Sequence, residues 1–289
     1  MKLGAWIEAM RLRTLPVSVS GVIAACGYCG LADCLHWRPA VLCLIFAVLA
    51  QISSNFANEY YDYKSGLDRP GRVGPRRGVT EGDLTPGTMK FAAFITLGLA
   101  CAVGCSLILW GGWWLIAVGI CIALGVLAYS TGPYPLSHHA LGEVAVIFFF
   151  GVIPVNFTFY LQSGYFDVSV AVGSVAVGLI GANILLVNNY RDKEDDEEVG
   201  KRTFAVKFGR TAASTWYLLN GFLAVTVMLP VWMVVSPAWL VVPGVYIAIH
   251  TFLWFRLNRL RGAALNPMLG LTAICMLFYC TGFLLAAVI

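Results

Sequence analysis

The chain has 289 residues, of which 59% are hydrophobic and 12% are charged, and its formal net charge is +4. Soluble domains carry about 25% charged residues, so this composition excludes an ordinary soluble protein and indicates a membrane protein. The basic residues lie in short loops between apolar runs and form no stripe, which excludes nucleic acid as a partner.

Nine apolar runs follow one another along the chain, each near the length of about 20 residues that crosses a bilayer as a helix. They occupy residues 15–35, 39–57, 90–109, 112–131, 141–162, 168–188, 214–235, 237–255 and 266–288. The first run contains a lipoprotein-like processing site at 23–26, but Glu8 precedes it and the apolar stretch continues to Leu35. We therefore expect a retained first helix and an all-α integral membrane protein, with nine transmembrane helices in one membrane-embedded domain over residues 1–289.

The distribution of Lys and Arg predicts the orientation, because positive residues near helix ends stay in the cytoplasm. With the N-terminus inside, eighteen of nineteen basic residues fall on the cytoplasmic side and Arg38 alone falls outside. A wrong helix count before residue 261 would distribute the basic residues over both sides of the membrane, so this pattern supports eight helices up to that point. The expected location is the cell membrane, meaning the inner or plasma membrane, as a multi-pass protein with a cytoplasmic N-terminus.

The acidic residues are placed just as unevenly, since eleven of fifteen lie in two cytoplasmic segments, within residues 59–83 and 192–198. The first segment follows the second apolar run and the other follows the sixth, which predicts two related four-helix halves plus a last helix. Each segment carries polar residues three or four positions apart, which share a helix face. At the start of the first segment and just before it, they are Asn55, Asn58 and Asp62. At the second segment and just before it, they are Asn188, Asp192 and Asp196.

Two facing helix ends of this kind suit a Mg²⁺-diphosphate. Mg²⁺ prefers oxygen ligands, keeps several waters, and is usually held by one or two carboxylates plus substrate phosphates. Nearby basic residues could neutralise the phosphate oxygens. They are Lys64, Arg72, Arg76, Arg191, Lys201 and Arg202. Solvated loop charges that set topology are the alternative, and we prefer it for Lys193, Glu197, Glu198, Lys207 and Arg210. The glycine-rich loop after Asp62 fits a lid or a plain connector.

Several motifs together resemble the UbiA-type intramembrane aromatic prenyltransferases. They include Asn58-x-x-x-Asp62-Tyr-Lys-x-Gly-x-Asp68, Asn188-Asn189-Tyr190-Arg191-Asp192 and Gly200-Lys201-Arg202-Thr203. Further matching stretches run from Arg11 to about residue 270, nearly the whole chain. Gly66 stands where ubiquinone-type members carry an additional Asp, which resembles the branch that prenylates 1,4-dihydroxy-2-naphthoate in menaquinone biosynthesis.

The resemblance implies nine helices around a central cavity, with Mg²⁺ ligands at Asn58, Asp62, Asp192 and Asp196. It implies transfer of a polyprenyl group from polyprenyl diphosphate to 1,4-dihydroxy-2-naphthoate with loss of CO2, which gives demethylmenaquinone. On this basis we expect Asp62, Asp192 and Tyr129 to be catalytic. Expected substrate contacts are Arg13, Asn55, Asn188, Tyr134 and Glu143.

Some of these assignments have competing interpretations. Tyr129, Tyr134 and Tyr190 could stabilise an allylic cation through their ring faces, although most aromatic residues of the chain must serve packing. Glu143 could orient substrate or simply be an acid at a helix N-terminus. Leu12 replaces the proline usual in the family between Arg11 and Arg13, which weakens any role assigned to either arginine.

Two other functions fit parts of the pattern. The same reaction could use another acceptor, such as 4-hydroxybenzoate, homogentisate, haem or a chlorophyll precursor. A transporter also suits many helices and internal two-fold similarity, but carriers usually place ionisable sites near the membrane midplane, whereas here the charges gather at one face. The prenyl length cannot be read from these motifs, because it depends on the depth of an apolar cavity.

Overall fold

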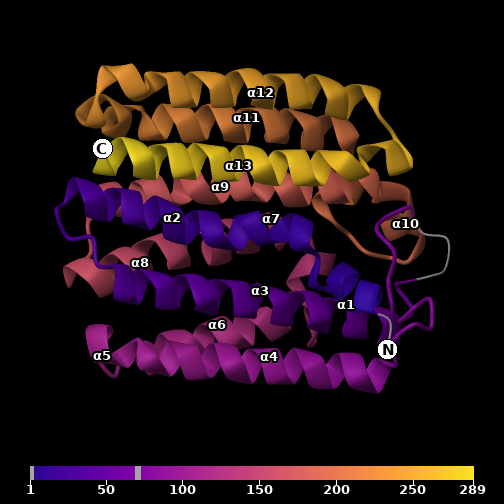
Figure 1. Ribbon diagram of the computed structural model, residues 1–289. Helices are drawn as coiled ribbons and strands as arrows, with labels where there is room; N and C mark the ends of the chain where they lie inside the picture. The colour runs from indigo at the N-terminus through magenta and orange to yellow at the C-terminus, as the bar shows by residue number, and fades with distance from the viewer. Residues whose placement is uncertain (1–2, 69–72) are drawn as a thin grey trace.

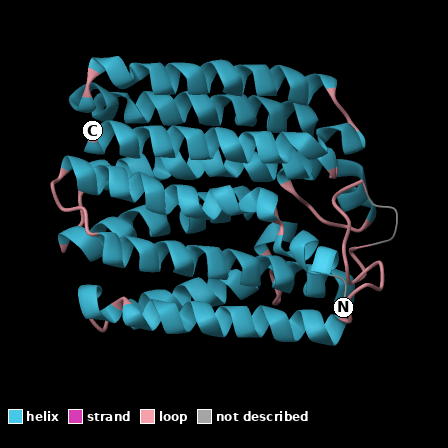
Figure 2. Ribbon diagram, in the orientation of Figure 1, coloured by secondary structure: helices cyan, strands magenta, loops and turns pink. Residues whose placement is uncertain are grey.

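The computed structural model describes residues 3–68 and 73–289, and this part of the chain is helical and contains no strand (Figure 2). Its α-helices are α1 (Leu3–Met10), α2 (Leu15–Leu31), α3 (Trp37–Lys64), α4 (Pro86–Ser106), α5 (Ile108–Gly111), α6 (Leu115–Ser130), α7 (Gly142–Val146), α8 (Ile153–Ser163), α9 (Val168–Arg191), α10 (Lys193–Glu198), α11 (Phe204–Val235), α12 (Val241–Arg259) and α13 (Asn266–Val288). Between them lie short 3-10 helices and one π-helix, η3 (Ile147–Val152). The predicted all-α class is confirmed.

Each of the nine expected apolar runs corresponds to a helical segment. In the described part of the chain, eight segments are long and apolar enough to cross a membrane, and Leu115–Tyr129 of α6 is a shorter apolar helix. The helix ends differ most from expectation, since α3 continues beyond residue 57 to Lys64, and α11 begins at Phe204 rather than at 214, with a kink at Gly209 (φ 83°, ψ 164°). Hydropathy falls where polar residues begin, but those residues still support helical hydrogen bonding, so the helix outlasts the apolar run.

The helices lie side by side as a bundle, with α9 near its centre (Figure 1). α9 packs against α11, α13 and η3, and 78% of its most apolar window is buried, against 17% for the α4 segment at the edge of the bundle. α3 packs on α4, and α2 packs on α13, which brings the last helix back to the first membrane helix.

The run expected at 141–162 is divided into α7, η3 and α8. Pro154 lies in the first turn of α8 and has no N–H to donate, so the preceding turn cannot continue as a regular α-helix. η3 lies unusually close to α9, because a Cβ added to Gly151 would be 2.5 Å from the Cα of Gly178. The absence of side chains at this crossing allows the two backbones to touch.

Both polar helix ends occur at the same end of the bundle. α1, α10 and the loop between α3 and α4 lie at this end, together with the N-terminus, and the C-terminus lies at the opposite end (Figure 1). α3 and α9 both finish here, so the residues that follow their apolar parts are brought towards each other.

Candidate active site

The polar ends of α3 and α9 line a single cavity of about 170 Å³. Its wall contains both predicted polar faces: Asn55, Asn58 and Asp62 from the first half, and Asn188, Asp192 and Asp196 from the second. Within each half, the helical spacing turns these side chains to one side. Asp192 is the joint between α9 and α10, and the backbone bond from Asp196 N to Asp192 O, 2.8 Å long, continues the helical turn.

The Asp62 carboxylate has hydrogen-bond partners from both halves of the chain. Its Oδ2 accepts hydrogen bonds from Asn58 Nδ2 at 3.1 Å and from Lys201 Nζ at 3.3 Å. Its Oδ1 lies 3.9 Å from His138 Nε2 and has no hydrogen-bond partner among the described residues. Asp62 belongs to the first half and Lys201 to the second, so this ion pair joins the two halves across the cavity.

Asp192 is held by its neighbour in the chain. Arg191 donates from Nε to Asp192 Oδ1 at 2.6 Å and from Nη2 to Oδ2 at 2.7 Å, and Nη2 also reaches Asn188 Oδ1 at 2.8 Å. Both charged side chains are only 1% exposed. Arg191 therefore fixes the direction of the Asp192 carboxylate. The Nη1 atom of Arg191 has no hydrogen-bond partner in the described chain.

The N-terminal segment closes one side of the cavity. Arg11 adopts a left-handed conformation (φ 51°) between α1 and the turn at Leu12–Thr14, and its Nη2 donates to Asn58 Oδ1. Asn55 Nδ2 donates to the carbonyl oxygen of Met10 at 2.9 Å. Arg11 lines the cavity, whereas Arg13 is exposed. The two arginines of the Arg11-Leu12-Arg13 stretch thus occupy different environments.

The donor set of the cavity fits a hard cation such as Mg²⁺. Every side chain of the two polar faces offers oxygen, and Asp62 Oδ1 is buried without a hydrogen-bond partner within residues 3–68 and 73–289. Over the same residues, no group of three or more His, Cys, Asp or Glu side chains is gathered at a spacing that could hold a metal. A cation here would take only a few protein ligands and the rest from phosphate and water, which is the usual coordination of Mg²⁺.

The predicted basic residues are divided between the cavity and the surface. Lys201 lines the cavity, but Lys64, Arg76 and Arg202 are exposed and are not among the described residues that line it. Arg76 pairs with Asp83 and with Glu8. Arg72 lies outside the described residues. Diphosphate binding by this set stays a prediction, with Lys201 the best placed of the described members.

The expected substrate contacts are divided in the same way. Asn55 and Asn188 line the cavity, as does Tyr129, which was expected to be catalytic. Tyr134 is 56% exposed and stacks on His139, with the two ring centroids 3.6 Å apart. Glu143 is buried behind the wall, where it accepts a hydrogen bond from Asn189.

Tyr190 is not among the described residues that line the cavity, so its ring is not placed to stabilise an allylic cation there. Its ring lies between the guanidinium groups of Arg210 and Arg261, each 5.4 Å from the ring centroid, and its hydroxyl accepts from Arg261 at 2.8 Å. Arg210 also pairs with Glu194 and lowers the pKa of that carboxyl below its usual value. These contacts tie α9, α10 and α11 together, so Tyr190 supports the second motif from outside the cavity.

Some residues of the cavity wall were not foreseen as site residues. Arg77 lies in the glycine-rich loop, is 8% exposed, and places its Nε 3.2 Å from Asp68 Oδ2. Thr203 and Asn189 also line the cavity. Asn189 had a usable signal, because a tandem pair of amides near the end of an apolar helix is costly in a membrane. Arg77 had none, because it sits in a loop whose course depends on tertiary contacts.

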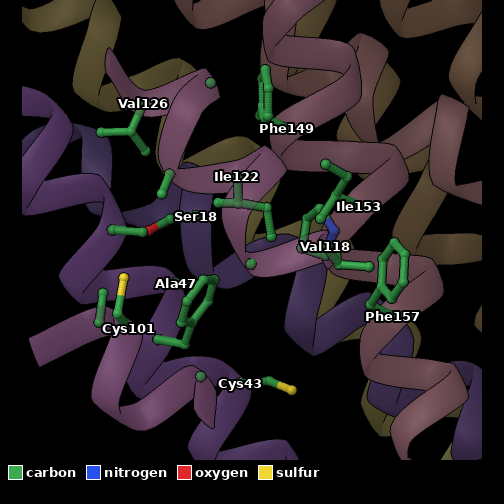
Figure 3. Close-up of a pocket in the computed structure, with 18 of the residues that line it drawn as sticks. Ser18, Cys43, Ala47, Cys101, Val118, Ile122, Val126, Phe149, Ile153 and Phe157 are labelled. Atoms are coloured by element: carbon green, nitrogen blue, oxygen red, sulfur yellow. The ribbon is translucent and has the colours of Figure 1, made fainter. Parts of the chain in front are cut away.

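A second, apolar cavity of about 310 Å³ adjoins the polar one. The two share wall residues Gln51, Ser54, Tyr129, Val146 and Phe150, which mark the junction between them. Figure 3 shows its lining, with Val118, Ile122 and Val126 from α6 beside Phe149 of η3 and Ile153 and Phe157 of α8. Such a wall suits a hydrocarbon chain whose polar end lies in the neighbouring cavity.

Part of the wall of the apolar cavity consists of exposed residues. Cys101 of α4 and Ile116 and Ile120 of α6 belong to its wall and are also exposed. These exposed wall residues lie on α4 and α6, and α4 is at the edge of the bundle (Figure 1).

Comparison with known proteins agrees with this arrangement. A sequence model of the UbiA prenyltransferase family matches residues 19–268. A 1,4-dihydroxy-2-naphthoate octaprenyltransferase of Mycobacterium tuberculosis is 36% identical over 277 residues, which cover 95% of this chain and 93% of the relative. The protein of the same description from Escherichia coli is 35% identical over 230 residues, which cover 76% of this chain and 74% of that relative.

The fold is also similar to a solved structure of a UbiA homolog from Archaeoglobus fulgidus bound to DMAPP and Mg²⁺. The TM-score is 0.69 and the sequence identity is 14%, and the match covers 96% of this chain and 98% of that one. At this identity the likeness concerns the fold alone.

Proposed function

Since this chain belongs to the UbiA prenyltransferase family, we propose that it transfers a polyprenyl group from polyprenyl diphosphate to 1,4-dihydroxy-2-naphthoate, with loss of CO2. The observation that carries the proposal is the junction of the two cavities, where an oxygen-rich polar pocket meets an apolar one at Tyr129, Val146 and Phe150. An allylic diphosphate has the same two parts, an anionic head and a hydrocarbon tail. The relatives described as 1,4-dihydroxy-2-naphthoate octaprenyltransferases support this choice of acceptor.

In the proposed mechanism, the polar faces of the two halves bind the diphosphate head. Asn58, Asp62, Asp192 and Asp196 would hold Mg²⁺, which when bound neutralises charge on the phosphate oxygens. Lys201 and Arg11 line the same cavity and place positive charge beside the leaving group. The Arg191 contact keeps the Asp192 carboxylate in place, so the site does not have to reorganise as charge develops.

The reaction centre would lie at the junction. The allylic C–O bond breaks, and its electron pair leaves with the diphosphate. A carbon of the electron-rich ring forms the new C–C bond to the prenyl group. The acceptor carboxylate leaves as CO2, and the electron pair of the broken ring–carboxylate bond stays with the ring; when the new bond forms at the neighbouring carbon, the proton lost there replaces the carboxylate. Tyr129 lines both cavities and offers a ring face to the allylic cation, and the apolar wall keeps water from capturing it.

The proposal is tested by product formation from purified protein, polyprenyl diphosphate and 1,4-dihydroxy-2-naphthoate. Removal of Mg²⁺ with a chelator should abolish turnover, because the head group then lacks its counter-charge, and added Mg²⁺ should restore it. No product with the naphthoate but turnover with 4-hydroxybenzoate would overturn the choice of acceptor and keep the chemistry. No turnover with any aromatic acceptor would contradict prenyl transfer altogether.

We place the protein in the inner or plasma membrane with the polar cavity facing the cytoplasm, because nearly all Lys and Arg residues lie at that end. Single-cysteine variants in a background without native cysteines should report this orientation. A membrane-impermeant maleimide should label His36→Cys in intact cells and should label Ser65→Cys only after the membrane is broken. Labelling of the second variant in intact cells would reverse the proposed orientation.

A further inference from the structure

A buried carboxylate lies behind the wall of the polar cavity. Glu143, at the start of α7, is 4% exposed, and its Oε1 accepts a hydrogen bond of 2.7 Å from Asn189 Nδ2 on α9. Its Oε2 has no hydrogen-bond partner among the residues described. Burying a carboxyl group with one unsatisfied oxygen is costly, and a simple acid at a helix N-terminus would gain more at an exposed position. The environment therefore indicates a specific role for this group.

The contact with Glu143 fixes the orientation of the Asn189 amide. The two ends of an amide are a donor and an acceptor, and a carboxylate oxygen beside the amide oxygen would repel it. Asn189 Nδ2 is therefore turned to Glu143, and Oδ1 is turned away from it. Asn189 is itself among the residues of the cavity wall, and in this orientation the amide oxygen is the acceptor of its side chain that the contact with Glu143 leaves available.

This acceptor lies beside the junction of the two cavities. Val146, one helical turn after Glu143, lines both cavities. Tyr129 also lines both, and its hydroxyl would be 3.8 Å from a Cβ added to Gly142, the residue before Glu143. The Glu143–Asn189 pair is thus adjacent to the place where an acceptor ring must meet the allylic carbon.

We propose that Asn189, oriented by Glu143, accepts a hydrogen bond from a ring hydroxyl of the aromatic acceptor and so selects hydroxylated rings and positions them for attack. The inference rests on the proposed function, since it assigns a contact within the same site. Asn189 touches the substrate in this scheme, and Glu143 is a positioning residue that acts through Asn189. Diphosphate binding is left to the residues around Asp62 and Asp192.

Two single variants and one double variant test the pair. Glu143→Gln keeps the shape but lets the Asn189 amide turn over, and Asn189→Ala removes the acceptor. Each should raise the KM for 1,4-dihydroxy-2-naphthoate about tenfold, the effect of losing one hydrogen bond, and leave the KM for polyprenyl diphosphate within about twofold. In Glu143→Gln/Asn189→Asp the new amide donates to the new carboxylate, which again presents an oxygen to the cavity, so most of the lost affinity should return.

A matched control is available on α8. Asn156 is another buried amide, which donates to Ser174 Oγ at 2.9 Å and to the Val152 carbonyl at 2.8 Å, and it is not among the described residues lining either cavity. Asn156→Ala should leave the KM for the acceptor unchanged. Equal changes in both KM values, or a double variant no better than Glu143→Gln, would show that the pair is only structural and would overturn the inference.

Equilibrium binding separates this inference from the proposed function. Titration of purified protein with 1,4-dihydroxy-2-naphthoate, without diphosphate, needs no turnover. Wild-type binding that Asn189→Ala weakens about tenfold would support the contact even if no product formed, and the missing product would then count against the proposed reaction alone. Binding unaffected by Asn189→Ala, or absent from the wild type, would overturn the contact.

Discussion

Asp62→Asn is expected to lower kcat/KM for prenyl transfer by about 10²–10³-fold at saturating Mg²⁺, the size of effect seen when one preorganised electrostatic contact to a developing charge is removed. The substitution keeps the side-chain shape but removes the charge that pairs with Lys201, and replaces a carboxylate whose Oδ1 has no hydrogen-bond partner in the described chain. The rate should be measured over a range of Mg²⁺ concentrations. A higher Mg²⁺ concentration at half-maximal rate would locate the loss at the cation.

The matched control is Glu81→Gln, which removes an exposed carboxylate from the loop between α3 and α4 and should have little effect. Asp192→Asn should resemble Asp62→Asn, because in the proposed mechanism the two carboxylates act on the same diphosphate from opposite halves. Groups that work as a unit give non-additive losses, so the double variant should be little worse than either single one. Asp62→Asn with activity within threefold of the wild type would remove Asp62 from the site.

Ala47→Phe is expected to discriminate against long prenyl chains. Ala47 lies on α3 in the wall of the apolar cavity (Figure 3), and a phenyl ring there takes up space that the hydrocarbon tail requires. A tail that no longer fits must leave apolar surface unburied, which costs a binding free energy of about 25 cal/mol per Å². The kcat/KM for a long polyprenyl diphosphate should therefore fall by tenfold or more. Geranyl diphosphate, whose tail is short, should react at nearly the wild-type rate.

Val172→Phe is the control for this substitution, because Val172 is 49% exposed on α9 and is not among the described residues of either cavity wall. It adds the same ring on the outside of the bundle and should leave both chain lengths unaffected. Equal losses for short and long chains in Ala47→Phe would mean that the ring disturbs the helix packing. No loss for either chain would show that the tail binds elsewhere.

The sequence predicts the polar faces of α3 and α9 well, because they depend only on helical spacing. Asn58 and Asp62 are four residues apart, as are Asp192 and Asp196, and helix geometry alone turns each pair to one side. The contact of Arg191 with Asp192 could not be foreseen in this way, since adjacent residues do not face each other on a regular helix. It forms because Asp192 is the joint at which α9 ends and α10 begins.

Contacts across the bundle could not be predicted from the sequence, for a related reason. Lys201 and Asp62 are 139 residues apart, and their hydrogen bond exists only once the two halves are packed. The π-helix at Ile147–Val152 was also hidden, because an apolar run has no pattern that distinguishes π from α geometry. The position of Arg77 follows from its contact with Asp68 and not from any local propensity.

The exposed wall residues of α4 and α6 bear on how substrate reaches this enzyme. Because residues of both helices are exposed and also form part of the apolar wall, we expect the tail to enter and leave from the lipid, without passing through water. The effective substrate concentration is then a mole fraction within one leaflet, not an amount per volume of buffer. Diluting the substrate with inert lipid at a constant bulk concentration should slow the reaction, and diluting the same vesicles with buffer should not.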